Sequence, residues 1–457
     1  MNPFHNPIFL MRLLKSYIID LNRLWHTTLE ELKRYQDKHL RKMVRYAYTV
    51  PLYHKKYREY GIHPDNIKGV RDLKKLPFIT KQDLRDNYPD NIIPNDFDKK
   101  HGFLLSTSGS TGKPVFIYYD LFSAIKYVEG FVRMLKAYGG SWSKSKIVLI
   151  VDTKEGTIEN AAFQESILPF ISKFVKTDNI KYLYVGDPID KLVNEVNDFK
   201  PDYLGSDPHM LREFAVYKNN GKADDINPTL IFSSEAMIDK YTRQYIEKAF
   251  NTKVLDTYGA TEAGPIAFEC IHDNGYHVNS DFVIIEALDD ENHDVPYDTP
   301  GKLVVTRLYG TGTPIIRYTG VEDIITPMEP VSNCGITSEM IRSIGGRSIE
   351  LIRLPNGETL APFHVTTIPA MVMDKYNSYK IKQFQIIQHT IDTIEILVVI
   401  DEKLRNIGPP VELLLKEIQE NFKRKVGADI NIKVREVSEI EKDVRSDYVR
   451  VVISHVK

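Results

Sequence analysis

The order of apolar and polar residues divides the chain into regions of different character. The first hundred residues read as mostly helical, since segment 28–48 repeats apolar residues near helical spacing with charged residues between them, and Pro51 stops it. Segment 1–25 is apolar but interrupted by Arg12 and Lys15, and no small-residue cleavage site follows. It therefore predicts an amphipathic helix rather than a signal peptide.

From about residue 103 the pattern changes to short apolar runs that end in small or polar residues. Helical segments, such as 238–250, lie between several of them. Strands that alternate with helices predict an α/β sheet, with a site where the strands end. The predicted strands lie in the runs GFLLSTSGSTGKPVFIYY, KIVLIVD, KYLYVGD, PTLIFSSE and KVLDTYGA.

The rest of the chain predicts a β-rich part and a small separate domain. Residues 280–325 alternate apolar and polar positions as strands do. The last hundred residues read as strand, strand, helix and strand, with Gly427 ending the helix. We expect the boundary between the two parts near the glycine-rich segment 343–348, with an N-terminal domain 1–346 and a C-terminal α+β domain 347–457.

Composition limits the function classes. The 457 residues are 42% hydrophobic, enough for a substantial core, and 60 basic residues balance 62 acidic ones to a net charge of −2. That balance gives no electrostatic case for nucleic acid or an anionic membrane surface. With only two cysteines a disulfide framework is excluded, and a cytoplasmic location fits. No stretch approaches the roughly 20 apolar residues that span a bilayer.

The strongest local signal is segment 106–114, STSGSTGKP. Small hydroxyl residues and two glycines leave backbone N–H groups free to surround phosphate oxygens, and Lys113 adds positive charge. It is not a Walker P-loop, because Thr107 stands where the first glycine is required and Pro114 replaces the magnesium-binding Ser or Thr. The alternative is a flexible Ser/Gly turn.

Three further segments carry weaker signals. Segment 256–262, DTYGATE, combines an aromatic ring that could stack on a base with a hydroxyl and a carboxylate suited to magnesium. Segment 317–323 reads RYTGVED, and 345–347 reads GGR. Taken singly, each is an ordinary turn or a linker.

In order and spacing, these four segments together resemble the adenylate-forming superfamily of acyl-CoA synthetases, peptide-synthetase adenylation domains and luciferases. Segment 40–89, the stretch TPIIRYTG, and Glu269-Cys270 with Gly275-Tyr276-His277 resemble the phenylacetate–CoA ligase subgroup. The resemblance implies a large adenylate-forming domain of layered α/β subdomains with a β-rich part at about 280–340, and a small C-terminal lid.

The resemblance also implies roles for single residues. The phosphate loop would bind the triphosphate of ATP, with Lys113 assisting catalysis. Thr261 would contact the α-phosphate, and Glu262 would hold Mg²⁺. The implied nucleotide-binding residues are Ser106, Ser108, Gly109, Ser110, Thr111, Gly112, Ser234, Glu235, Tyr258, Gly259, Asp323 and Arg347. For the acid that holds the ribose, the usual spacing favours Glu322, whereas the usual residue order favours Asp323, which we prefer.

A metal site is a further expectation. Cys270, His277 and Cys334 are ligands that zinc prefers, and His272 lies near them in sequence. Members of the subgroup often carry a Cys/His site here, ending in Cys-x-Cys-Gly, whereas this chain has Ser332-Asn333-Cys334-Gly335. His272 or a water could complete four ligands of a structural zinc. The alternative is two buried free cysteines.

The C-terminus departs from the family pattern. Relatives end in Arg-Ser/Thr-x-Gly-Lys, whose lysine assists adenylation, whereas residues 444–451 read VRSDYVRV. Three alternatives stay open. The chain is a working ligase that forms an acyl-adenylate and then a CoA thioester, or it uses a hydroxyl or amine acceptor, or it binds nucleotide without turnover.

The resemblance implies a small carboxylic acid, often aromatic, as substrate, with ATP, Mg²⁺ and coenzyme A, and it leaves a homodimer open. From charge and hydropathy we expect no nucleic-acid partner and no membrane span. Segments 152–164 and 204–213 would line the acyl pocket, with Phe163, His209 and Met210 as candidate walls.

Overall fold

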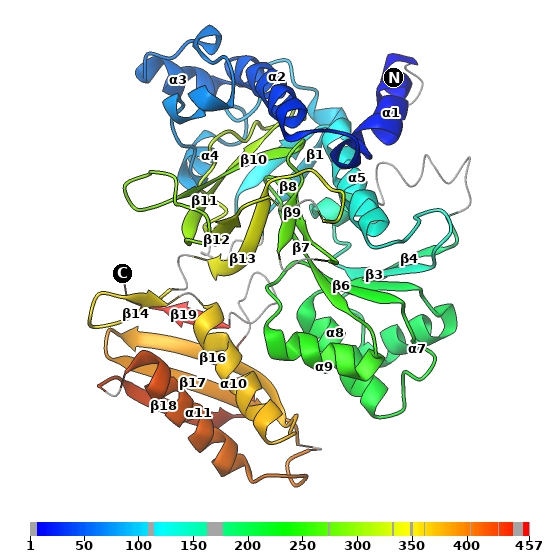
Figure 1. Cartoon of the computed structure of the whole chain (residues 1–457), viewed down its shortest axis with the longest axis vertical. Coiled ribbons are helices and arrows are strands. Elements are labelled where there is room, and N and C mark those ends of the chain that lie inside the picture. Colours follow the sequence, from blue (N-terminus) through cyan, green and yellow to red (C-terminus); the bar gives the residue numbers. More distant parts are fainter. Residues whose placement is uncertain are drawn as a thin grey trace.

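A computed structural model describes residues 7–107, 114–161, 177–272, 275–330, 333–347, 351–360, 362–402, 404–427, 429–441 and 451–456 (Figure 1). Its N-terminal part is helical, as predicted. The predicted helix 28–48 is α2, which begins with a capping box between Thr28 and Glu31. Pro51 does more than end that helix, because it starts the next one. The helices and helical turns are α1 (Pro7–Lys15), η2 (Ser16–Asp20), η3 (Arg23–Trp25), α2 (Leu29–Ala47), α3 (Pro51–Glu59), η4 (Pro64–Asn66), η5 (Val70–Lys75), α4 (Lys81–Asn87) and η6 (Lys99–His101).

The middle of the chain forms the predicted α/β layer. Five parallel strands lie in the order β7, β6, β5, β3, β4. These strands are β3 (Ile147–Val151), β4 (Ile180–Tyr184), β5 (Tyr203–Ser206), β6 (Leu230–Ser233) and β7 (Val254–Ala260). The described helices of this part are α5 (Leu121–Ala137), α7 (Ile189–Phe199), α8 (Pro208–Asn219) and α9 (Lys240–Phe250).

Strand β7 joins this layer to the β-rich part. It pairs in parallel with β6 through residues 254–256 and antiparallel with β8 through 257–260. One eleven-stranded sheet results, whose antiparallel members are β8 (Gly264–Glu269), β9 (Tyr276–Val278), β10 (Val283–Leu288), β11 (Gly301–Arg307), β12 (Asp323–Met328) and β13 (Met340–Arg347).

The glycine-rich segment near the predicted domain boundary forms a strand over its first five residues. Residues 343–347 belong to β13, which pairs with β12 through Asp323 and Arg347. Two glycines suggested a flexible joint, but a strand next to an ordered neighbour tolerates them because the ladder fixes the backbone.

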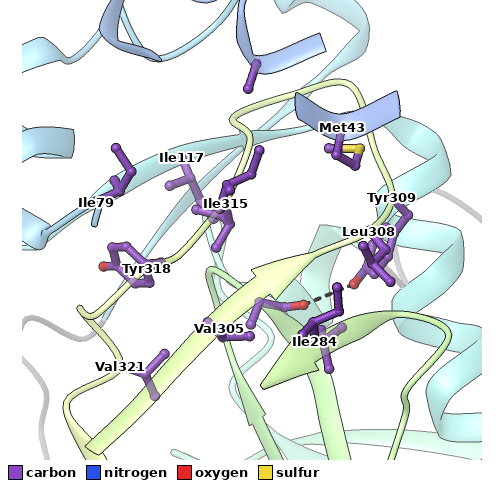
Figure 2. Close-up of a cluster of buried hydrophobic side chains, with 14 of the residues drawn as sticks. Met43, Ile79, Ile117, Ile284, Val305, Leu308, Tyr309, Ile315, Tyr318 and Val321 are labelled. Atoms are coloured by element: carbon purple, nitrogen blue, oxygen red, sulfur yellow. Dashed lines mark hydrogen bonds between the residues drawn. The ribbon is translucent and has the colours of Figure 1, made fainter. Parts of the chain in front are cut away.

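A single large core holds the N-terminal helices, the hairpin β1 (Phe103–Ser106)–β2 (Phe116–Tyr119) and the antiparallel strands together. Figure 2 shows Met43 of α2 beside Tyr309, and Ile117 of β2 beside Ile315. Ile284 on β10 and Val305 on β11 lie beneath them in the same cluster. This packing fixes the hairpin, and with it the base of the predicted phosphate loop, against the large sheet.

The C-terminal part has its own core and a four-stranded sheet in the order β18, β17, β16, β19. The predicted order of strand, strand, helix and strand is confirmed by β16, β17, α11 and β18, whereas α10 and β19 were not predicted. Its elements are β14 (Ile352–Arg353), β15 (Thr359–Leu360), α10 (Phe363–Lys375), β16 (Ile381–Thr390), β17 (Thr393–Ile400), α11 (Val411–Val426), β18 (Asn431–Val437) and β19 (Val452–Ser454).

The C-terminal part rests on the helices of the parallel layer (Figure 1). The Arg212 guanidinium on α8 donates to the carbonyl oxygen of Ile381 at 2.8 Å, and the rings of Tyr245 and Tyr379 lie 4.3 Å apart. The predicted fold class, a large α/β and β-rich part with a small α+β domain, is therefore confirmed.

Candidate functional site

Segment 256–262 runs through the second half of β7 and the turn that follows it. The Tyr258 hydroxyl donates to Asp323 Oδ2 at 2.6 Å, which ties β7 to the first residue of β12. Glu262 is 4% exposed, and its Oε1 accepts a hydrogen bond from the Tyr318 hydroxyl at 2.7 Å. The sheet thus gathers an aromatic ring and two carboxyl groups from segments 256–262 and 317–323.

The backbone around Glu262 is also fixed. The Arg307 guanidinium donates to the Glu262 carbonyl oxygen at 2.9 Å, and the Tyr119 hydroxyl donates to the Thr261 carbonyl oxygen at 2.9 Å. Burial raises the pKa of Tyr318, and the neighbouring Glu262 charge adds to the shift. Tyr318 therefore stays protonated at neutral pH and donates its hydrogen bond to a Glu262 carboxylate.

Tyr119 connects the base of the phosphate loop with Thr261, beside Glu262. It ends β2, the strand that leaves the loop, and β1 and β2 pair antiparallel with Ser106 opposite Phe116. The loop is closed at its base by Thr107, whose N–H donates to the Val115 carbonyl at 3.0 Å. Residues Ser108, Gly109, Ser110, Thr111, Gly112 and Lys113 lie outside the described residues.

The two candidate ribose acids have different surroundings. The Glu322 carboxylate is paired with Lys81, at 2.6 Å, on the side of the N-terminal helices. Asp323 instead contacts Tyr258 and pairs in register with Arg347, whose side chain lies outside the described part. Only Asp323, of the two, contacts the residues gathered at the end of β7.

Ser234 and Glu235 follow directly after β6, the neighbour of β7. The Ser234 N–H donates to the Ser206 carbonyl oxygen at 3.1 Å. Glu235 is exposed, and its φ of 68° lies in the left-handed region, which residues other than glycine rarely adopt. Such a conformation often marks a functional turn at a strand end.

Asp256, the first residue of the motif, is buried and differs from the other acids of the site. The Tyr276 hydroxyl donates to its Oδ2 at 2.9 Å, while Oδ1 is buried without a hydrogen-bond partner among the described residues. Burial raises the pKa of Asp256 to about 7, against the lowering effect of the Tyr276 hydrogen bond. A carboxyl group at this depth is most stable with its proton.

The raised pKa of Asp256 predicts that the stability of the protein depends on pH. An unfolded aspartate ionises above about pH 4, whereas folded Asp256 holds its proton up to about pH 7. Its contribution to stability is complete below about pH 4 and is lost as the pH rises to about 7. Between pH 5 and pH 8, Asp256→Asn should therefore gain about 2–3 kcal/mol over the wild type. Urea unfolding of both proteins at each pH measures this, and a constant difference would contradict a neutral Asp256.

The predicted metal ligands do come together. Ligand atoms of Cys270, His277 and Cys334 all lie within 4.8 Å of one another, with Cys334 Sγ 3.0 Å from His277 Nε2. His277 Nδ1 lies 3.0 Å from the Ser338 hydroxyl, the kind of contact that orients a histidine ligand. A tetrahedral zinc would hold sulfur and nitrogen about 3.6 Å apart, so this donor set fits zinc.

A small cavity of about 90 Å³ adjoins this cluster. It is lined by all three candidate ligands and by His272. The cavity therefore offers room for a water, or for His272, in a fourth position.

Sequence reasoning missed several residues that shape the site. Tyr119 lies in an apolar strand and gave no polar signal, and Arg307 looked like an ordinary strand residue. Tyr127 on α5 donates to Glu159 Oε1 at 2.7 Å, and burial raises the pKa of Glu159. No motif marks this pair, since its members are 32 residues apart.

The candidate acyl-pocket residues are only partly placed. His209 is exposed and Met210 buried in the first turn of α8, directly after β5. Phe163 lies outside the described residues, as does most of the C-terminal segment 444–451.

Known proteins resemble this chain over most of its length. The model of the CapK C-terminal domain matches residues 364–455. The chain is 27% identical over 441 residues to the phenylacetate-coenzyme A ligase of Aromatoleum evansii, covering 93% of this chain and 94% of that protein. Other phenylacetate-coenzyme A ligases, from Pseudomonas putida and Thermus thermophilus, are 25% and 24% identical over 89% of this chain. The resemblance to phenylacetate–CoA ligases that the sequence predicted is thus confirmed.

Two further proteins are similar to this chain over most of its length. Protein CapK of Staphylococcus aureus is 25% identical over 394 residues, covering 83% of this chain and 80% of CapK. A 2-hydroxyisobutyryl-CoA ligase crystallised in its postadenylation state superposes with a TM-score of 0.77 at 19% identity, over 94% of this chain and 90% of the ligase. That structure supports the fold of both parts of the chain.

Proposed function

We propose that this protein activates a carboxylic acid with ATP, forming an acyl-adenylate and pyrophosphate, and then transfers the acyl group to coenzyme A. The observation that carries the proposal is that segments 256–262 and 317–323 meet through two hydrogen bonds, from Tyr258 to Asp323 and from Tyr318 to the buried Glu262. The Tyr119 hydroxyl, at the end of the strand that leaves the phosphate loop, also donates to the Thr261 carbonyl oxygen. Relatives named phenylacetate-coenzyme A ligase, spanning most of the chain, support the same activity.

In the proposed reaction, these residues neutralise the negative charge of ATP. A carboxylate is a weak nucleophile, and the phosphates of ATP repel it. Backbone N–H groups of segment 106–113, with Lys113, would neutralise part of that charge and orient the α-phosphate for attack. Thr261 would contact this phosphate, and Glu262 would hold Mg²⁺, whose charge stabilises the phosphate oxygens.

The nucleoside half of ATP would bind along β7 and β12. Tyr258 and Gly259 would lie against the adenine, with Ser234 and Glu235 at its edge. Asp323 would accept hydrogen bonds from the ribose hydroxyls, and Arg347, opposite it in the ladder, would contact ribose or phosphate. Charged acceptors make the stronger hydrogen bonds with such hydroxyls.

Product analysis tests the proposal. The protein is incubated with ATP, Mg²⁺ and a panel of aryl and alkyl acids, with and without coenzyme A, and the products are identified by mass spectrometry. A CoA thioester from at least one acid is expected. If no acid gives AMP, the chain is a nucleotide-binding protein without turnover and the proposal is wrong.

A second candidate is transfer of the activated group to a hydroxyl or amine rather than to coenzyme A. The absence of the Gly-Lys pair from residues 444–451 keeps it open, because the chain departs there from the relatives that form CoA thioesters. In the same experiment, acyl-adenylate without any thioester would select this candidate.

Asp323 and Glu322 provide a matched pair of variants. We expect Asp323→Asn to raise the KM for ATP about 10- to 100-fold, because a charged acceptor for the ribose hydroxyls is lost. Glu322→Gln, which breaks only the ion pair with Lys81, should change it less than about threefold. Steady-state kinetics with varied ATP measures both, and equal effects would contradict the assignment of Asp323.

We also propose that Cys270, His277 and Cys334 bind a structural Zn²⁺. The protein isolated with zinc should contain about one ion per chain by elemental analysis, and its two thiols should react with a thiol reagent only after chelation. His277→Ala should lose the ion, whereas His272→Ala should keep it if water is the fourth ligand. Fast thiol reaction and no bound zinc would leave two buried free cysteines.

The domain boundary after residue 346, a homodimer and a cytoplasmic location stay predictions from the sequence. Among the described residues, no helix combines the length and the apolar character needed to cross a bilayer.

A further inference from the structure

The outer face of the N-terminal segment 7–19, made of α1 and most of η2, is apolar, and no described residue covers it. None of the residues of α1 is buried. Ile8, Met11, Leu14 and Ile18 are 60%, 64%, 58% and 58% exposed. Leu10, Tyr17 and Ile19 are exposed as well. So many large apolar side chains in one short segment exceed what a protein leaves in water without a partner.

The segment has an inner and an outer side. At about 100° per residue, these seven exposed side chains cover an arc of roughly 200°. Phe9, Leu13, Ser16 and Asp20 occupy the opposite arc and are less exposed. The inner side is fixed to the body by Lys126, whose ammonium group lies 2.6 Å from the Ser16 hydroxyl and 3.0 Å from Asp20. The outer side therefore faces away from the protein, at the edge where Figure 1 draws α1.

The local charge of the segment differs from that of the whole chain. Residues 1–19 contain Arg12 and Lys15 and no aspartate or glutamate, although the chain as a whole carries −2. On the helical projection, Arg12 lies just beyond one edge of the apolar arc and Lys15 lies within the arc near the same edge. The whole-chain balance that argues against an anionic membrane surface thus does not describe this segment.

We propose that segment 7–19 rests on an anionic lipid bilayer, with its apolar arc at the level of the acyl chains and Arg12 and Lys15 at the phosphates. Short helices with an apolar face and flanking cations bind such surfaces reversibly. Tyr17 and Trp142, whose ring centroids lie 6.4 Å apart, add the aromatic side chains that favour the membrane–water interface.

A second copy of the chain is the other occupant that the apolar face could have. In a two-fold pairing, the segment would meet itself. Arg12 and Lys15 would then face a surface without a single acidic residue, and the like charges would repel each other. A bilayer with anionic headgroups supplies the missing counter-charge.

Sedimentation with vesicles tests the proposal on the full chain. Phosphatidylcholine vesicles are compared with vesicles that contain equal parts of phosphatidylglycerol. We expect binding to the anionic vesicles, reduced about tenfold by the triple variant Ile8→Asn, Met11→Asn, Ile18→Asn, and similarly by Arg12→Gln with Lys15→Gln. Ile407→Asn is the matched control, because Ile407 is exposed elsewhere at 63%.

The outcomes separate the alternatives. Binding that falls with salt and with both sets of substitutions, but not with Ile407→Asn, supports the proposal. No vesicle binding, or binding that the substitutions leave unchanged, overturns it. A dimer seen by light scattering that becomes monomeric in the triple variant, without vesicle binding, assigns the face to a second copy. Unchanged thermal unfolding of the variants excludes loss of the fold as the cause.

Discussion

Glu262→Gln is expected to lower the rate of acid-dependent AMP formation by about 10²- to 10³-fold, the loss typical of a buried group that stabilises transition-state charge. Glu262 is 4% exposed, and Tyr318 and Arg307 hold its side chain and backbone. Glutamine keeps the shape of the side chain but removes the charge that would hold Mg²⁺. Rates measured over a range of Mg²⁺ concentrations should show that the variant also needs more metal.

Tyr318→Phe serves as the comparison. This substitution removes the 2.7 Å hydrogen bond to Glu262 and leaves the Glu262 charge in place. The rate of acid-dependent AMP formation should therefore fall about tenfold or less. If Glu262→Gln had no more effect than Tyr318→Phe, Glu262 would be a structural acid and not a metal ligand. Circular dichroism of both variants confirms that the fold is retained.

Arg133→Met is expected to lower the free energy of unfolding by about 3–5 kcal/mol, because it removes the close partner of the buried Asp281 carboxylate and leaves it a longer contact, 3.6 Å, with Arg23. Arg133 and Asp281 are fully buried, and two guanidinium nitrogens donate to the carboxylate at 2.7 and 2.8 Å. The same guanidinium donates to the Asp20 carbonyl oxygen at 2.7 Å. Arg133 thus joins α5, the N-terminal segment and the turn before β10.

Urea unfolding followed by tryptophan fluorescence measures this effect, since Trp25 and Trp142, the two tryptophans of the chain, both lie near the N-terminal segment. Arg45→Ala is the control, because its ion pair with Asp65 is exposed and should contribute about 1 kcal/mol or less. Adding Asp281→Leu to Arg133→Met should restore part of the stability. A loss no larger than that of Arg45→Ala would contradict a stabilising role of the buried pair.

The sequence predicted the elements whose apolar spacing is regular, and it located the site through short polar segments at strand ends. Helix α2 and strands β3, β6 and β7 follow from such local patterns. The course of residues 343–347 could not be predicted in this way, because pairing with β12 decides it and that partner lies about twenty residues earlier.

The site features that the sequence did not predict depend on contacts between residues that are distant in the chain. The choice between Glu322 and Asp323 could not be made from spacing, whereas the Lys81 ion pair and the Tyr258 hydrogen bond distinguish them at once. Likewise, Cys270, His277 and Cys334 were candidates by residue type, and only folding brings their ligand atoms within 4.8 Å. Tyr119 carried no signal at all, since its role depends on the hairpin packing against the sheet.

Exchange of labelled pyrophosphate into ATP tests the central claim most directly, because it requires segments 106–114 and 256–262 to act on one Mg-nucleotide. We predict exchange that depends on both Mg²⁺ and an acid from the panel and that Glu262→Gln nearly abolishes. Exchange at the wild-type rate in Glu262→Gln, or no exchange and no ATP binding with any acid, would contradict the account.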